Sequence, residues 1–124
     1  MSAPHPAAGT PWPTEIRLAK AKDELTVGFE GGESFELPAE MLRVMSPSAE
    51  VQGHSPAQRV LLGGKRAVKI TAIEPIGNYA VRLRFDDGHD TGLFTWGYLH
   101  KLGRERTQLW TAYLDELKAA GKNR

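Results

Sequence analysis

Apolar and polar residues alternate in the first third of the chain, and this spacing constrains the fold more than any other feature. The apolar positions are Ile16, Leu18, Leu25, Val27, Phe29, Phe35 and Leu37. A repeat of two places every second side chain on the same face of a β-strand. The stretches between them, "AKD" and "EGGE", are rich in turn residues. The pattern therefore predicts three short strands joined by tight turns.

A second group of strands is predicted between residues 67 and 95. Residues 67–77 and 78–85 meet at Gly77-Asn78, which favours a hairpin, and residues 90–95 return after Asp87-Gly88. Alternate residues of the middle strand form one face, and they are Tyr79, Val81, Leu83 and Phe85.

The Asp87-Gly88 pair predicts a two-residue type I′ turn, because both central residues of that turn take a positive φ angle. Such a turn places Asp86 directly across from His89 and predicts a contact between the two side chains. His89 then serves either as a ligand or general base, or as half of a surface ion pair at a hairpin tip. The second interpretation is favoured, because a metal site needs three or four converging ligands.

Helices are expected in three places. Pro38, at a first helical position, opens a short helix over residues 38–45. Residues 95–102 form another short helix, which Gly103 ends. The longest helix spans residues 104–121, and its apolar stripe consists of Leu109, Trp110, Tyr113, Leu114 and Leu117. The Ser-, Pro- and Gly-rich residues 46–58 predict a loop, and the basic end "KNR" is expected to fray.

Together these elements predict a small α+β domain with two groups of short antiparallel strands, short helices and a covering C-terminal helix. The Pro- and Ala-rich residues 1–13 are expected to form a disordered tail, and residues 14–120 a single domain. The opening residues lack the basic start and apolar core of a secretory signal, and no stretch approaches the roughly 20 apolar residues of a membrane span. We therefore expect a cytoplasmic protein without membrane contact.

The residue types and their spacing exclude several kinds of chemistry. The sequence contains no cysteine, which removes disulfides, thiolate metal sites, iron–sulfur ligation and cysteine nucleophiles. Gly64-Lys65-Arg66 opens a strand rather than a helix, so it does not fit a phosphate-binding loop. No Gly-x-Ser-x-Gly elbow is present, and His89-Asp90 lacks the spacing of an iron facial triad. We find no catalytic set and expect that the protein is not an enzyme.

A local basic patch is predicted from Arg59, Lys65, Arg66 and Lys69. It is either a nucleic-acid contact or a solvated strand edge at which lysines prevent pairing with another strand. The net charge of +1 provides no overall field that would attract nucleic acid. The strand-edge interpretation is favoured, and nucleic acid is not the expected partner.

Three segments share a distinctive combination of motifs: "LTVGFEGGESFELP", "LPAEMLRVMSPSAEVQGH" and "VKITAIEPIGNYAVRLRFDDGHDTGLFTWGYLHKLG". From about Ile16 to Gly103 the chain resembles the γ-butyrobetaine hydroxylase-like N-terminal domain family, including the small stand-alone bacterial proteins known as DUF971. The resemblance implies a compact α+β module. In γ-butyrobetaine and trimethyllysine hydroxylases this module precedes a 2-oxoglutarate- and iron-dependent barrel, and in some iron–sulfur carrier proteins it is appended to an ATPase.

The resemblance also implies a structural zinc site, held in the hydroxylases by a Cys-x-Cys-x-x-Cys cluster and the histidine of Asp-Gly-His. Here the cysteine positions fall at Ser46, Ser48 and Val51, and only His89 matches a family ligand. Serine hydroxyls are poor zinc ligands and valine is none, so we expect the zinc site to be lost. A candidate substitute set for zinc or iron is His89, His54 and Glu50.

Two functions follow from these observations. The first is a non-catalytic accessory or interaction module without a cofactor, which docks onto a protein partner or pairs with itself. The resemblance suggests an iron–sulfur carrier ATPase or an oxygenase as that partner. Candidate contact residues, besides the loop 46–58, are Arg82, Arg84, Trp96, Tyr98 and Trp110. The alternative is an auxiliary metal-binding factor in iron–sulfur assembly or iron delivery.

Overall fold

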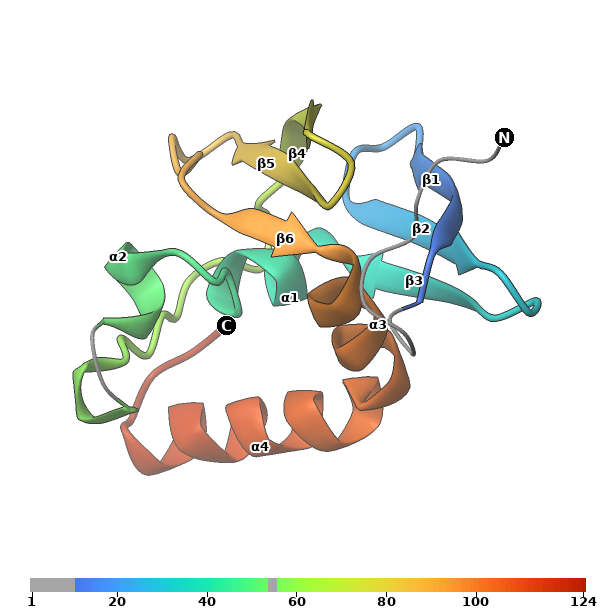
Figure 1. Ribbon diagram of the computed structural model, residues 1–124. Helices are drawn as coiled ribbons and strands as arrows, with labels where there is room; N and C mark the ends of the chain where they lie inside the picture. The colour runs from blue at the N-terminus through green and yellow to red at the C-terminus, as the bar shows by residue number, and fades with distance from the viewer. Residues whose placement is uncertain (1–10, 54–55) are drawn as a thin grey trace, which may run out of the picture.

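Two antiparallel sheets of three strands each form the upper layer of the protein (Figure 1). The computed structural model describes residues 11–53 and 56–124. The first sheet has the order β1 (Pro13–Leu18), β2 (Glu24–Phe29), β3 (Ser34–Pro38), and the second β4 (Ile70–Ile76), β5 (Ala80–Phe85), β6 (Leu93–Thr95). The predicted α+β class with two groups of antiparallel strands is confirmed.

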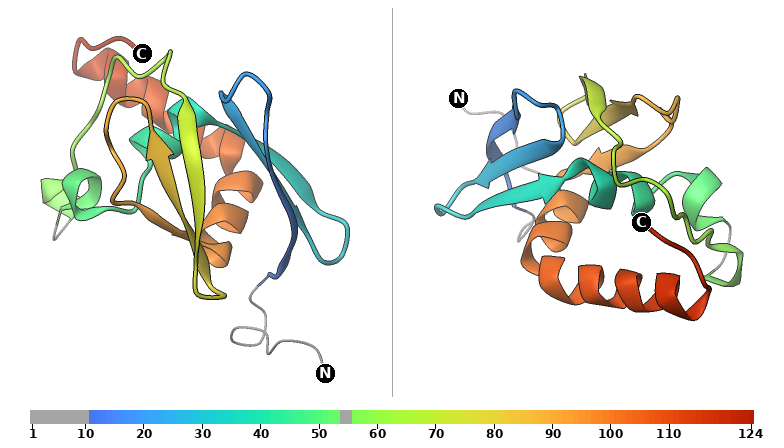
Figure 2. Two further views of the ribbon diagram at one scale, coloured as in Figure 1. Left: turned by 90° about the horizontal axis from the view of Figure 1, so that it is seen from above. Right: turned by 180° about the vertical axis from the view of Figure 1, so that it is seen from behind.

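The helices lie on the opposite side of the molecule from the sheets. They are α1 (Ala39–Val44), α2 (Ala49–Gln52), the 3₁₀ turn η1 (Pro56–Gln58), α3 (Trp96–Arg104) and α4 (Arg106–Ala119). Figure 2 shows the two sheets side by side, with α4 as the layer farthest from them and α1 and α3 in between. The C-terminal helix therefore covers the domain as predicted.

The alternating pattern of the sequence creates one core that both sheets share. In the first sheet Leu25 pairs with Leu37, and both side chains are fully buried. The same core includes Leu83 and Phe94 from the second sheet, and Leu99 from α3. Among the described residues, no helix combines the length and hydrophobicity that a membrane span requires.

Ordered structure begins slightly earlier than the composition indicated. Residues 1–10 of the predicted tail lie outside the described residues. Trp12, however, packs against the core, its carbonyl accepts a hydrogen bond from the Glu30 amide, and Pro13 begins β1. An apolar partner in the core thus orders residues that composition alone assigned to a tail.

Two local predictions are wrong. Residues 46–58 are not all loop, because α2 and η1 lie within them, and the buried side chain of Val51 fixes α2 to the domain. Pro38 is the N-cap of α1 rather than its first residue, since it also ends β3 in an extended conformation.

The C-terminal residues also do not fray. Gly121 has a φ angle of +68°, its amide donates to the Lys118 carbonyl, and the Lys122 amide donates to the Leu117 carbonyl. This pair of bonds is a Schellman motif, which ends α4 and turns the chain back onto the protein. The Gly64 amide then donates to the Asn123 carbonyl. The basic end of the chain is therefore docked by contacts with distant residues.

Gly103 does not end α3, which continues to Arg104. A Cβ atom on residue 103 would lie 2.3 Å from Cγ of Phe35 in β3. Glycine is required at this position because the helix approaches the ring closely.

We expect Gly103→Ala to lower the free energy of unfolding by about 1–3 kcal/mol, because the added methyl group overpacks the contact with Phe35. Gly97→Ala in the same helix is the matched control, since its Cβ meets nothing within 4 Å. It should be neutral or stabilise by up to about 1 kcal/mol through helix propensity. Urea unfolding followed by circular dichroism measures both. Equal effects of the two substitutions would contradict the packing role of Gly103.

Candidate functional site

The turn after β5 differs from the predicted type I′ turn. The Gly88 amide donates to the Phe85 carbonyl, and the Phe85 amide donates to the His89 carbonyl. Asp86 and Asp87 are therefore the central residues, and Gly88 follows them with a φ angle of +90°. This is a three-residue connection with glycine at the left-handed position. The shift of one residue changes which side chains face one another.

His89 contacts the loop before α2 instead of Asp86. Its Nε2 atom lies 2.9 Å from Ser46 Oγ and 3.4 Å from Ser48 Oγ, and its Nδ1 atom lies 3.0 Å from Glu50 Oε2. The Asp86 carboxylate instead accepts a hydrogen bond from the Lys69 amide, so the predicted contact between Asp86 and His89 is wrong. We call Ser46, Ser48, Glu50 and His89 the His89 cluster.

The His89 cluster joins two loops inside the protein. Ser46 is 0% exposed and His89 5%, whereas the Glu50 side chain reaches solvent. A Cβ on Gly92 would lie 2.2 Å from Ser46 Oγ, so glycine there allows the hairpin to approach the serine. The order hydroxyl, imidazole, carboxylate resembles that of a serine nucleophile with its base. A fully buried hydroxyl is closed to a substrate, however, and the geometry holds the loops together.

The residues present do not fit the zinc site that the family resemblance implies. The two serines at cysteine positions do face His89, but their hydroxyls form hydrogen bonds with the ring nitrogen, and hydroxyls bind zinc poorly. Val51 is a buried apolar residue. Of the predicted substitute set, His89 and Glu50 meet, while His54 lies outside the described residues. Among residues 11–53 and 56–124, no group of three His, Cys, Asp or Glu side chains could hold a metal. Metal binding stays a prediction from the sequence.

Ser46→Ala is expected to lower the free energy of unfolding by about 1–3 kcal/mol, because it removes the nearest partner of the buried Nε2 atom. Ser48→Ala is the matched comparison and should cost less, because its hydroxyl is 3.4 Å away. Urea unfolding at neutral pH measures both. A larger cost for Ser48→Ala would show that Ser46 is not the main partner.

Asp87 has a structural role that the sequence pattern did not indicate, since the pattern assigned it only to the turn. Its Oδ2 atom lies 2.7 Å from Arg43 Nε of α1 and 2.7 Å from Lys65 Nζ, and its Oδ1 atom accepts the His89 amide. Arg43 Nη1 is buried without a hydrogen-bond partner. Asp87 is therefore the ionic partner that balances the charge of the buried Arg43 guanidinium.

The pKa of Asp87 is lowered from 3.8 to about 2. Burial alone would raise this pKa, but hydrogen bonds from Lys65, the His89 amide and Arg43 outweigh that effect. A carboxyl with a depressed folded pKa contributes stability above its unfolded pKa. This contribution is lost as the pH falls from about 4 towards 2.

We expect Asp87→Asn to destabilise the protein by about 1–3 kcal/mol at pH 7, because it removes charge-assisted hydrogen bonds to Arg43 and Lys65. The difference from the wild type should shrink as the pH falls through this window. Asp86→Asn, in the same turn, keeps the oxygen that accepts the Lys69 amide and should change stability little. Chemical unfolding at a series of pH values measures both, and a pH-independent loss for Asp87→Asn would contradict the ionic role.

The predicted contact residues occupy very different surroundings. Trp96 is only 7% exposed and its Nε1 donates to the Asn78 carbonyl, so its side chain lies in the core. Tyr98 donates its hydroxyl to the Met45 carbonyl, and Trp110 packs partly buried against the core.

The other two predicted contact residues lie on β5. Arg84 is exposed and forms an ion pair with Glu74, and Arg82 is half-buried opposite Glu74 in the register of β4 and β5.

In the described part of the chain, the exposed large apolar residues are Val60, Tyr79, Leu93 and Leu114, and none of them was a predicted contact residue. Tyr79 was assigned to an apolar strand face but is 47% exposed, because it lies in the turn before β5 begins at Ala80. Leu114 belonged to the predicted stripe of the C-terminal helix, yet it is 37% exposed. Periodicity identified the apolar residues of this helix without showing which of them the domain covers.

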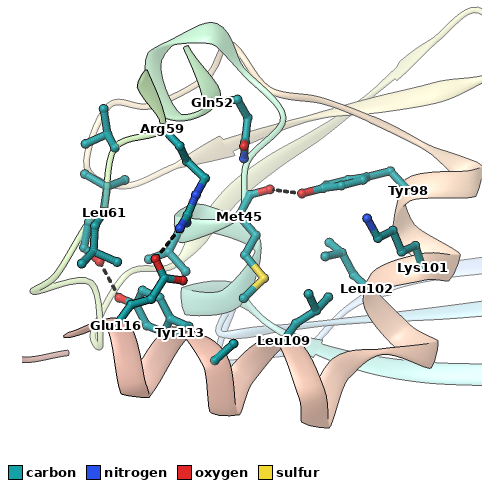
Figure 3. A pocket seen from close by; sticks show the side chains of 14 residues that line it. Met45, Gln52, Arg59, Leu61, Tyr98, Lys101, Leu102, Leu109, Tyr113 and Glu116 are labelled. Carbon is teal, nitrogen blue, oxygen red and sulfur yellow. Dashed lines mark hydrogen bonds and ion pairs between the residues drawn. The ribbon is translucent and has the colours of Figure 1, made fainter. Parts of the chain in front are cut away.

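A groove of about 240 Å³ lies between α4 and the loop that follows η1, and we call it the α4 groove (Figure 3). Its apolar wall includes Met45, Val60, Leu61, Leu102, Leu109 and Ala112. Tyr98 and Tyr113 line it with their hydroxyls bonded to the Met45 and Leu62 carbonyls. Figure 3 shows Arg59 reaching across to Glu116, with which it forms an ion pair.

Comparison with solved structures shows which proteins share this fold. One NMR solution structure is 52% identical, with coverage of 94% of this chain and 91% of that chain and a TM-score of 0.81. A second NMR structure is 46% identical, with 98% and 91% coverage and a TM-score of 0.81. A crystal structure of an Acidithiobacillus ferrooxidans protein of unknown function from the DUF971 family is 36% identical. It covers 73% of this chain and 91% of its own, with a TM-score of 0.60.

The family described as gamma-butyrobetaine hydroxylase-like, N-terminal, matches residues 16–100. The chain belongs to this family, and the resemblance found in its sequence is confirmed. No curated protein matched the chain.

Proposed function

We propose that the protein is a non-catalytic interaction module that binds a partner protein through the α4 groove. The observation that supports this proposal is an open, largely apolar hollow whose walls are already ordered. A volume of about 240 Å³ suits one or two anchoring side chains, and it is below the range typical of small-molecule sites. Apolar anchors that fill such pockets supply much of the affinity of protein interfaces.

The groove is organised before any partner arrives. The hydroxyls of Tyr98 and Tyr113 are bonded to backbone carbonyls, which fixes both rings. The Gln52 side chain donates to the Ser46 carbonyl, so α2 is tied to the His89 cluster on one side of the groove. Ordered walls reduce the entropy lost on binding. Val60, 43% exposed, offers apolar surface at the rim.

The proposed partner is a cytoplasmic protein, and the segment that binds carries a large apolar side chain. A chain without cysteine needs no oxidising compartment for its stability. From the family resemblance, the first candidates to test are an iron–sulfur carrier ATPase and an oxygenase of the same organism.

Ala112→Trp should abolish partner binding, because Ala112 is exposed and lines the groove, which the indole would fill. Thr111→Trp is the matched control, since Thr111 is exposed on the same helix but does not line the groove. The measurement is titration calorimetry of each purified candidate against the wild type and both variants, after capture from an extract of the source organism has ranked the candidates.

A one-to-one complex that Thr111→Trp retains and Ala112→Trp loses by at least tenfold in affinity supports the proposal. Equal binding by both variants moves the interface away from the groove. Unfolding curves of the two variants, which should match the wild type, exclude loss of fold as the cause.

A further inference from the structure

We infer that a second pocket, next to the end of α4, binds an acidic segment of a partner protein that also carries an apolar side chain. This inference rests on the proposed interaction role and names the chemistry of the segment recognised. The pocket is a shallow hollow of about 440 Å³ lined by Arg66, Lys118, Lys122, Arg124, Leu114 and Leu117, together with Asn123. We call it the cationic pocket.

The charge of the cationic pocket is largely uncompensated. Four of its lining residues are cations and none is acidic, although the whole chain carries a net charge of only +1. Arg124 is paired with Glu40. Lys122 Nζ donates to the Leu61 carbonyl, which leaves its charge unbalanced. In the part of the chain that the structure describes, the side chains of Arg66 and Lys118 have no ion pair or hydrogen bond.

The pocket is built from segments that are distant in sequence and fixed in place. The Schellman motif at Gly121 directs the chain across α4, and the Asn123 carbonyl accepts the Gly64 amide at 2.9 Å. Arg124 makes a bidentate contact with Glu40 and lies over the Trp110 ring, 5.4 Å from its centroid. A ligand therefore meets cations whose backbone is already ordered, which favours binding.

The residues of the pocket favour an acidic peptide over nucleic acid. Leu114, 37% exposed, lies among the cations and offers an apolar contact beside the charges. Single-stranded nucleic acid is held by an extended basic track with aromatic platforms for the bases. The cationic pocket is compact, and no aromatic residue lines it among the described residues, since Arg124 lies over Trp110. Carboxylates flanking a leucine or phenylalanine match this arrangement.

The test is an NMR titration of the isotope-labelled full chain with an N-acetylated EDLLDE peptide at two ionic strengths. We expect saturable amide shifts in residues 64–66 and 114–124, and weaker binding at the higher ionic strength because the contact is ionic. The double variant Arg66→Glu with Lys118→Glu should lose at least tenfold in affinity, and Leu114→Ser several-fold. Titrations with inorganic phosphate, a KKLLKK peptide and an oligothymidylate provide the comparison.

The matched control is Lys20→Glu with Arg104→Glu, which makes the same change in net charge at exposed cations outside the pocket. This control should bind the peptide like the wild type. Equal losses in the two double variants would indicate a general field effect and overturn the inference. So would shifts that do not saturate at millimolar peptide, tighter binding of oligothymidylate, or the same affinity for phosphate alone.

The test also separates this inference from the proposed function. Ala112→Trp, which fills the α4 groove, should bind the acidic peptide normally. Loss of the partner in Ala112→Trp without peptide binding at the cationic pocket leaves the α4 groove as the interface and rejects the second site.

Discussion

The carboxylate of Asp87 joins three segments that are distant from one another in the sequence. It forms ion pairs with Arg43 of α1 and Lys65 of the loop before β4, and it accepts a hydrogen bond from the His89 amide in its own turn. Without this carboxylate, the buried guanidinium of Arg43 would lose its ionic partner. A buried charge without its partner is strongly destabilising. The position of the turn, and of the residues that the turn contacts, therefore depends strongly on this carboxylate.

The His89 cluster is the first structure that depends on the turn. Because Asp87 fixes the backbone at His89, the imidazole enters the protein and meets the loop that leads into α2. The family resemblance implies a metal cross-link at this place, and here hydrogen bonds join the same two loops. A metal site that links two loops makes folding depend on metal supply and on deprotonated ligands. The hydrogen bonds among serine, histidine and glutamate need no metal, because the chain itself supplies every group.

The sequence predicted the strands well because their burial follows from local alternation, as at Leu25 and Val27. It failed where distant partners decide. The turn type was misjudged because Asp87 was treated only as a turn residue, whereas its carboxylate is bound on three sides. Composition placed residues 122–124 in a frayed end, yet Glu40 and a carbonyl of a distant loop hold them.

In the candidate site, too, residues within a local motif could be predicted, whereas surfaces formed by distant segments could not. The hairpin motif and the family resemblance selected His89, and the resemblance selected Glu50, which lies near the family's ligand positions; these two side chains do meet. Neither the α4 groove nor the cationic pocket could be predicted, since each is lined by residues from segments at least 36 positions apart, from Leu62 to Tyr98 in the groove and from Arg66 to Leu114 in the pocket. Aromatic residues were candidates by type alone, and type does not show that Trp96 is in the core.

The contacts of the C-terminal segment bear on the order in which the protein folds. Each sheet is a meander of neighbouring strands, so its pairings close short loops. The bonds of Tyr113 to Leu62, Lys122 to Leu61 and Arg124 to Glu40 span 51, 61 and 84 residues. Closing longer loops costs more entropy, so we expect these contacts to form after the meanders. Both proposed binding surfaces include residues of this C-terminal segment, so a bound partner should reduce its local opening.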